Sequence, residues 1–467
     1  MDLTTFEAFD TAASTIRNSA VFRVQDFVSY SWGHTHFSLS SANVEYAHAV
    51  GLTGAGETIA VIDGGYFVGH DELSSKDITS IGELDVPGEN DHGTAVTALL
   101  ASDGSTGEMI GVSPGSDLHL STFHDLNTMA SATNDARIQG AIVQNNSWGW
   151  PGTPGTQADF DSLRSAPGGG AYVNSLRDFA ETGVIVFAGA NDYSISSYGL
   201  AMALPDFIPG LENSFITAIN AVPTVDATGQ VTGATRLSGA CLEAARYCMA
   251  ADGTVWSAYI FDATPENDYT EWTGTSFSAP QVSGAVALLA EAFPSLGPEE
   301  LRARLLASAN NEFFEHSGYV QFSETVTHGF NSEFGHGFLD VAAALLPIGG
   351  SYVPSSSGGA VSLDAPMVSS SGPAGPAISS RLAAYDVIFS DGLGAEFDAP
   401  ANILTAYGVP QGNPWGFVSE LMATDSSRQS ALGSAFGDYV RGHELGYSAG
   451  TGDVSLLLPE GDASNMG

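Results

Sequence analysis

The chain has 467 residues, which is room for one large domain and accessory segments. It carries 53 acidic residues against 13 basic ones, for a formal charge of −40, and Lys76 is its only lysine. Charged residues make up only 14% of the chain, against about 25% in an average protein. Because most of the charged residues present are acidic, the shortfall lies in the basic residues. Nucleic-acid binding needs clustered cations and is excluded as a function class, whereas adaptation to salt is compatible but not required.

The first segment, residues 1–48, carries no recognisable motif but is rich in aromatic residues, which are rare in disordered chains. We therefore expect it to be an ordered segment packed on the core that follows. Its start, Met1-Asp2-Leu3, lacks the basic and apolar regions of a signal peptide, so an exported protein beginning here would be a mature form. No stretch of the chain reaches the about 18–20 apolar residues of a membrane span.

Two elements follow that each end or begin at a polar residue. Thr58–Ile62 is a short, apolar, β-branched run, which is typical of a buried parallel strand, and Asp63 comes at its carboxyl end. His92 stands just before a helical run from Ala95 to Ala101. The sequence therefore predicts a carboxylate at a strand end and an imidazole at a helix start.

Two further elements follow the same pattern later in the chain. Val184–Ala188 is strand-like and leads into a turn that contains Asn191. Ser276 precedes Ala279–Leu289, which is apolar nearly all round and predicts a central buried helix. We expect Pro280 to lie in the first turn of that helix, where no backbone donor is needed.

Asp63, His92 and Ser276 together supply the groups of a nucleophilic hydrolase. A serine hydroxyl is a poor nucleophile at neutral pH and needs a base, and an imidazole base needs a carboxylate that holds its tautomer. Singly, each residue has an ordinary alternative, as a turn former, a loop residue or part of a polar cluster. The three residues together, in this order and with these flanking sequences, are poorly explained by chance.

The flanking motifs add a family resemblance. They are Val61-Ile62-Asp63-Gly64-Gly65, Asp91-His92-Gly93-Thr94 and Gly274-Thr275-Ser276-Phe277-Ser278-Ala279-Pro280. With these motifs the chain resembles the subtilisin-like serine peptidases, the subtilase family. The alternating strands and helices predict an α/β fold with a parallel sheet. The resemblance implies the subtilisin-like three-layer fold, with a central, mostly parallel β-sheet, helices on both faces and a C-terminal accessory segment.

The resemblance also implies an oxyanion site. In subtilases an asparagine after the corresponding strand donates its side-chain amide to the oxyanion, and Asn191 matches it. The alternative is an asparagine that simply forms a turn. The family usually has glycine before this asparagine, whereas this chain has Ala190, which would be strained if the backbone there needs a positive φ.

Substrate binding can be placed by the same resemblance. Ser147, Trp148 and Gly149 match the end of the subtilase strand that pairs with an extended peptide and lines one wall of the primary pocket. Ala188 and Gly189 would form the facing wall. Trp148 could equally be a core or rim aromatic. Walls without an obvious carboxylate argue for apolar primary residues in the substrate.

Cys241 and Cys248 are the only cysteines, with six residues between them, and too few other ligands lie nearby for a metal site. In an acidic peptidase of secreted type we expect them to form a small disulfide loop, with two free buried cysteines as the alternative. We expect no cofactor for catalysis. Calcium is a common structural ion in subtilases, but no Asp-rich loop places it here.

The segment around the cysteines resembles a stretch of subtilases that are exported as bacterial autotransporters, although Leu242, Tyr247 and Asp252 replace its Gly, Trp and Pro. Near the end, Tyr385–Phe389 and Leu432–Val440 resemble the stretch that joins such peptidases to a translocating β-barrel. This resemblance implies a barrel in the full-length precursor. It also implies a secreted or cell-surface location on a Gram-negative bacterium.

The resulting domain prediction has four parts. They are an N-terminal segment (1–48), a peptidase domain (49–347), a Gly/Ser/Pro-rich linker (348–380) and a C-terminal passenger segment (381–467). The predicted function is an extracellular serine endopeptidase that acts on proteins or peptides through an acyl-enzyme. The alternative is a surface adhesion or interaction module on an inactive scaffold, which an intact set of four site residues disfavours.

Overall fold

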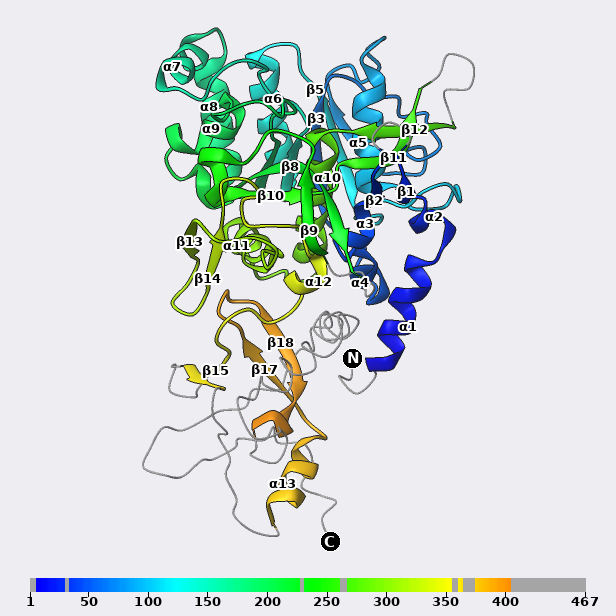
Figure 1. The fold of residues 1–467 in the computed structure, drawn as a ribbon, viewed down its shortest axis with the longest axis vertical. Helices are drawn as coiled ribbons and strands as arrows, with labels where there is room; N and C mark the ends of the chain where they lie inside the picture. Colours follow the sequence, from blue (N-terminus) through cyan, green and yellow to red (C-terminus); the bar gives the residue numbers. More distant parts are fainter. Residues whose placement is uncertain are drawn as a thin grey trace.

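The computed structural model describes residues 6–29, 33–226, 231–260, 267–354, 360–363 and 374–404 (Figure 1). Its centre is an eight-stranded sheet in the order β10-β8-β7-β6-β3-β5-β4, with β9 paired to β8. Every pairing is parallel except that of β9. In chain order the strands are β3 (Thr58–Asp63), β4 (Ile78–Ile81), β5 (Asp117–Thr122), β6 (Val143–Asn146), β7 (Val184–Ala188), β8 (Phe215–Val225), β9 (Val231–Arg236) and β10 (Cys248–Ala251).

Helices cover both faces of this sheet because its strands are apolar on both sides. Along β7, Val184 and Val186 join one buried cluster, whereas Ile185 and Phe187 join another, as the period of two in a strand requires. The first cluster includes α5 (Asn90–Ala101) and α10 (Thr275–Ala292). The second includes α6 (Leu126–Ile138), α7 (Gln157–Ser165), α8 (Gly169–Ala180) and α9 (Leu200–Phe207). The predicted three-layer α/β fold is confirmed.

The N-terminal segment packs along one side of this body (Figure 1). Phe22, Leu39 and Val44 belong to the main buried cluster, and His36 Nδ1 lies 2.8 Å from Asp252 Oδ1, both side chains being fully buried. The elements of the N-terminal segment are α1 (Phe6–Arg17), α2 (Ala20–Arg23), β1 (Asp26–Val28), β2 (Thr35–Phe37), α3 (Ser38–Ser41) and α4 (Val44–Ala49). The predicted boundary after residue 48 falls inside helix α4.

Two hairpins and two helices complete the body before residue 347. The hairpin of β11 (Thr254–Tyr259) and β12 (Asp268–Thr273) leads directly into α10. A second hairpin, β13 (Gly318–Gln321) with β14 (Thr327–Phe330), lies between α11 (Pro298–Ser308) and α12 (Val341–Ala344). No helix within the described part of the chain is long and apolar enough to cross a membrane.

The C-terminal part forms a small antiparallel sheet in the order β16-β15-β17-β18, drawn in yellow and orange in Figure 1. Its elements are β15 (Tyr352–Pro354), β16 (Ala360–Ser362), α13 (Ala374–Leu382), β17 (Asp386–Ser390) and β18 (Glu396–Pro400). The predicted linker 348–380 is therefore wrong for its described residues. Composition missed it because β15 pairs with β17, which lies more than 30 residues further along the chain. The predicted motif 432–440 lies outside the described residues.

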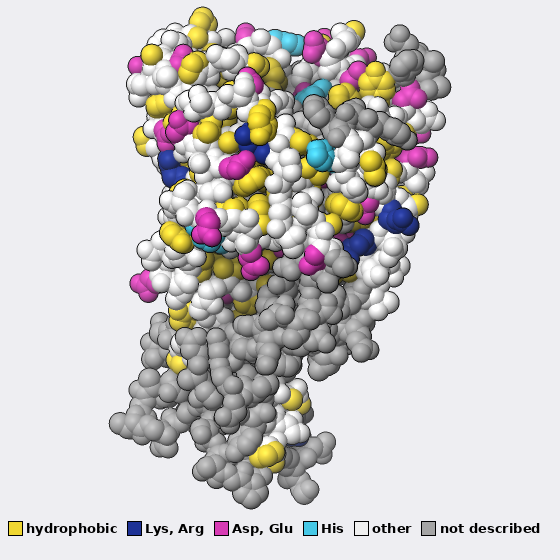
Figure 2. All heavy atoms as spheres, viewed as in Figure 1, with side chains coloured by type: hydrophobic (Ala, Val, Ile, Leu, Met, Phe, Trp, Pro, Cys, Tyr) yellow, Lys and Arg dark blue, Asp and Glu magenta, His cyan; other side chains and the backbone are white. Residues whose placement is uncertain are grey.

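The body and the small sheet share one buried core. Phe293 of the body and Phe397 of β18 have ring centroids 5.3 Å apart, and the Arg304 guanidinium donates to the Asp391 carboxylate at 2.7 Å, with both side chains fully buried. On the face seen in Figure 2, acidic side chains are scattered among uncharged ones and Lys or Arg are few. The surface there matches the composition, with no basic cluster on the visible described residues.

Candidate active site

Asp63 and His92 meet at the carboxyl edge of the central sheet. Asp63 is the last residue of β3, and its carboxylate accepts the backbone N–H of Gly64 at 2.7 Å. His92 lies in the first turn of α5, and its Nδ1 lies 2.9 Å and 3.0 Å from the two carboxylate oxygens. Donation from Nδ1–H to Asp63 leaves Nε2 with the free lone pair.

A glycine allows this approach. A Cβ on Gly93 would lie 2.2 Å from the carbonyl oxygen of Gly65, so no other residue lets the start of α5 lie against the turn after β3. Burial lowers the pKa of His92, but the charge of Asp63 and its hydrogen bond outweigh burial and leave the pKa raised above the ordinary 6.5. The imidazole is therefore a stronger base than a free histidine.

Ser276 is the second residue of α10. Gly274, the residue just before the helix, has a φ of 148°. The His92 ring centroid lies 5.8 Å from that of Phe277, so the imidazole lies beside the residue next to the serine. The Ser276 hydroxyl donates to the carbonyl oxygen of Ser147 at 3.0 Å.

Pro280 also has a place in the site, although it is the sixth residue of α10 and not in the first turn as predicted. Proline has no N–H, so the carbonyl oxygen of Ser276, four residues earlier, loses its partner within the helix. The Ser147 hydroxyl donates to that oxygen at 2.7 Å instead. The hydrogen bond that replaces the missing helical one thus joins α10 to the end of β6.

Asn191 is oriented by the residue before the serine. Its Oδ1 accepts the backbone N–H of Thr275 at 2.9 Å, so its Nδ2 donors face the other way. Thr275 Oγ in turn donates to the carbonyl oxygen of Gly189 at 2.7 Å. Among the described non-glycine residues only Asn43 and Leu242 have a positive φ, so the replacement of glycine by Ala190 carries no strain.

A cavity of about 520 Å³ opens beside these residues. Its lining includes Ser276 and Asn191. It also includes every residue predicted to bind substrate, namely Ser147, Trp148, Gly149, Ala188 and Gly189. Trp148 is also anchored to the core, because its Nε1–H donates to the carbonyl oxygen of Ile62 at 2.9 Å.

The sequence missed the opposite wall of the cavity. Ile195, Tyr198 and Leu200 line it, and so does Asp192, an acidic residue that the sequence expectation did not include. The Asp192 carboxylate accepts the Ser194 hydroxyl at 2.7 Å and the Ser194 N–H at 2.8 Å, and these bonds lower its pKa. Only its position directly after Asn191 could have indicated this residue.

Comparison with known proteins settles the family. A model described as "Subtilase family" matches residues 54–337, which contain Asp63, His92, Asn191 and Ser276. The chain belongs to the subtilase family. It is 27% identical over 281 residues to subtilisin DY of Bacillus licheniformis, covering 59% of this subtilase and 91% of that protein. It is 25% identical over 348 residues to an extracellular serine protease of Serratia marcescens, and the match covers 60% of this subtilase and 32% of that protein.

Among solved structures, this subtilase is similar to fervidolysin from Fervidobacterium pennivorans, a keratinolytic enzyme related to subtilisin. The identity is 20% and the TM-score is 0.49, over 73% of this chain and 51% of that one. Membership of the family makes this subtilase a serine endopeptidase, a hydrolase of peptide bonds. Within its described residues, no group of three or more His, Cys, Asp or Glu side chains could hold a metal ion.

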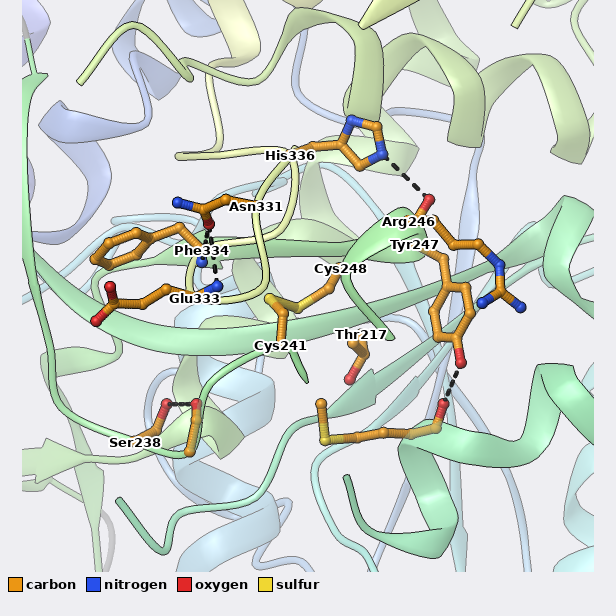
Figure 3. Close-up of a disulfide and its surroundings, with 12 residues drawn as sticks. Thr217, Ser238, Cys241, Arg246, Tyr247, Cys248, Asn331, Glu333, Phe334 and His336 are labelled. Carbon is orange, nitrogen blue, oxygen red and sulfur yellow. Dashed lines mark hydrogen bonds between the residues drawn. A yellow bond between two sulfur atoms is a disulfide. The ribbon is translucent and has the colours of Figure 1, made fainter. Parts of the chain in front are cut away.

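The predicted disulfide is present. Cys241 and Cys248 are bonded, with Cα atoms 5.9 Å apart, and both side chains are fully buried (Figure 3). The residues between them form a short 3-10 helix, η3 (Leu242–Tyr247). Leu242 has a φ of 51° in the left-handed region.

Proposed function

We propose that this subtilase is an extracellular endopeptidase that cleaves protein substrates with Asp63, His92 and Ser276 as its catalytic triad. The observation that carries the proposal is the hydrogen bond from His92 Nδ1 to Asp63, formed while the imidazole lies beside Phe277. This arrangement holds the base in the tautomer that leaves Nε2 free for the serine proton.

The reaction follows from the placed groups. The Ser276 hydroxyl turns from the Ser147 carbonyl, gives its proton to His92 Nε2 and attacks the scissile carbonyl carbon. The oxyanion accepts hydrogen bonds from Asn191 Nδ2 and the N–H of Ser276, which belongs to the first turn of α10 and has no partner within the helix. Protonated His92 then gives its proton to the leaving amine as the C–N bond breaks, and water hydrolyses the acyl-enzyme by the same route.

The cavity supports a preference for large apolar primary residues. Trp148, Trp150, Tyr198 and Leu200 present apolar surface to it, and the volume of about 520 Å³ is far larger than a small side chain needs. Asp192 at the lining offers a partner for a cationic side chain, so a long basic residue is the second preference. The extended peptide would pair its main chain with the end of β6.

Location outside the cell is supported by two features. Disulfides persist in oxidising compartments, and the Cys241–Cys248 bond joins two fully buried side chains. The similar protein of Serratia marcescens is described as extracellular. Export as an autotransporter passenger rests on the sequence resemblances around residues 241–252 and 385–389.

Substitution of the nucleophile tests the mechanism. Ser276→Ala should reduce proteolysis to the residual rate that oxyanion binding alone provides, with far-UV circular dichroism and thermal midpoint unchanged. Because members of a triad act as a unit, adding His92→Ala should cost little more. Substantial cleavage by purified Ser276→Ala protein, free of contaminating peptidase, would contradict the assignment.

A further inference from the structure

One wall of the substrate cavity is an irregular segment, residues 192–199, here called the pocket loop. It connects β7 to α9, and Ile195 and Tyr198 of this loop line the cavity. Its last residues are held next to another lining segment, because the N–H of Gly155, which follows the lining residue Pro154, donates to the Tyr198 carbonyl at 3.0 Å. A segment without regular structure keeps its shape only through such contacts.

Further contacts of the pocket loop come from the disulfide turn, residues 241–248. The Glu243 carboxylate accepts the Tyr198 backbone N–H at 3.0 Å and the Ser197 hydroxyl at 3.1 Å. One carboxylate thus binds two consecutive residues of the cavity wall. The hydrogen bonds are charge-assisted and therefore stronger than neutral ones.

The same turn reaches the other end of Tyr198. The Tyr198 hydroxyl donates to Asp206, and Asp206 pairs with the Arg246 guanidinium at 2.5 Å. Arg246 also pairs with Glu212 at 3.0 Å. Burial and the hydrogen bond to Asp206 raise the pKa of Tyr198, so the phenol stays protonated as a donor.

The chain just before the disulfide contacts the start of the loop. The Gly239 N–H donates to the Ala190 carbonyl at 2.8 Å, one residue before Asn191. A Cβ on Gly239 would lie 2.7 Å from Ile195 Cδ1 and 2.9 Å from the Ala190 carbonyl oxygen. The Arg236 guanidinium lies 4.0 Å from the centroid of the Tyr193 ring. Residues 236–246 therefore contact the chain at several points between Ala190 and Tyr198.

We propose that Glu243 is a specificity-determining positioning residue, through which the disulfide turn holds the pocket loop in the shape that accepts a large primary side chain. Figure 3 shows Arg246 and Tyr247 extending from this turn beside the buried disulfide. Leu242, held at a φ of 51° between Cys241 and Glu243, stores backbone strain of the kind found at functional sites. The kinetic part of the inference rests on the proposed function.

Kinetics with two peptides that differ only in the primary residue, Phe or Ala, test the inference. Glu243→Ala should lower kcat/KM for the Phe peptide about tenfold, the order expected for loss of a hydrogen bond to a charged group, chiefly through KM. The Ala peptide, which does not reach the loop, should change less than about twofold. Glu243→Gln, which keeps one acceptor oxygen, should give an intermediate loss.

Glu181→Ala is the matched control, since it removes the same charge from an exposed site at the end of α8. It should leave both peptides unchanged. The rate of fluorophosphonate labelling at Ser276 should be equal in all variants, because the small probe does not need the loop. Equal losses for both peptides, or no loss for either, would overturn the inference.

A readout without catalysis separates this inference from the proposed function. Amide hydrogen exchange of the pocket loop, and of Tyr198 above all, should become about tenfold faster in Glu243→Ala and stay unchanged in Glu181→Ala. Unchanged exchange in Glu243→Ala would overturn the inference whether or not the protein cleaves peptides. A wild-type protein that fails to label or cleave would overturn the proposed function alone.

Discussion

The contact between Asp63 and His92 sets the pH at which the site can work. His92 must be neutral to accept the serine proton, and its pKa is raised above the ordinary 6.5 because the charge and hydrogen bond of Asp63 outweigh burial. The fraction of usable base therefore falls as pH drops through a value above 6.5. The acidic composition of the chain does not shift this requirement.

The pH dependence of kcat/KM checks this. The wild-type acid limb should have its midpoint above about 6.5, the value of an unperturbed imidazole. Asp63→Asn should move that midpoint to lower pH, because the charge is lost, and should lower kcat by about 10⁴ because the wrong tautomer is favoured. A wild-type profile that peaks near about pH 4, where a free imidazole is charged, would contradict the assignment of His92 as base.

Asn191 provides a second test at the same scale. Thr275 fixes the orientation of its amide, so the Nδ2 donors are aimed before substrate binds. Asn191→Leu should lower kcat by about 10²–10³, which corresponds to about 2.7–4 kcal/mol and is a value established in a subtilisin, with KM nearly unchanged. Steady-state kinetics on one peptide measures both constants. A change in kcat of less than about threefold would remove Asn191 from the oxyanion site.

Asp63, His92, Ser276 and Asn191 could be singled out from the sequence as candidates because each sits in a short motif at an end of a regular element. Tyr198 and Asp192 could not, because the pocket loop has no periodicity and its shape depends on Glu243, which is 45 residues away from Tyr198 in the chain. Local pattern carries no information on such contacts.

At the scale of elements, β6 and α10 are joined by a run of buried polar side chains. Ser283 donates to Asn145 at 3.0 Å, Asn145 donates to the Ser147 hydroxyl at 2.9 Å, and Ser147 donates to the Ser276 carbonyl at 2.7 Å. The last bond exists because Pro280 has no N–H. The sequence predicted both elements but placed Pro280 in the first turn, and so did not predict this connection.

Ser147→Ala tests the connection. It leaves the Asn145 amide and the Ser276 carbonyl without these partners, and each unsatisfied buried group costs about 1–3 kcal/mol. We expect the free energy of unfolding to fall by about 2–6 kcal/mol in total. Urea unfolding followed by tryptophan fluorescence measures it.

Ser162→Ala is the control for that measurement, because its exposed hydroxyl donates only within α7. It should change the unfolding free energy by less than about 0.5 kcal/mol, as surface substitutions usually do. Equal stability of the two variants would show that the Ser147 hydroxyl does not connect β6 to α10.

At the scale of the whole molecule, the small C-terminal sheet is part of the peptidase core. Fully buried Arg304 donates to Asp391 and to the carbonyl oxygens of Ala344 and Leu346. Asp391 also accepts the N–H groups of Ile348, Leu393 and Ala395 at 2.8–3.0 Å. The Gly/Ser/Pro-rich composition of 348–380 predicted a linker because pairing between distant strands leaves no trace in local composition.

Asp391→Ala should therefore destabilise the whole protein. Removal of one partner of a buried ion pair typically costs about 3–5 kcal/mol, because the other charge stays buried without compensation. Arg304→Met in the same background removes that charge and should restore part of the loss. Thermal and urea unfolding of the single and double variants measure both effects. A loss below about 1 kcal/mol in Asp391→Ala would show that the two parts are independent.

The most direct test of the central claim is to locate covalent labelling by a fluorophosphonate. Attack on phosphorus by an activated serine, with loss of fluoride, requires the nucleophile, its base and the oxyanion donors at once. Peptide mass spectrometry of the wild-type protein should find a single adduct on Ser276, and labelling should be lost in Ser276→Ala and strongly slowed in Asp63→Asn. An unlabelled wild-type protein, or an adduct on another residue, would contradict the account.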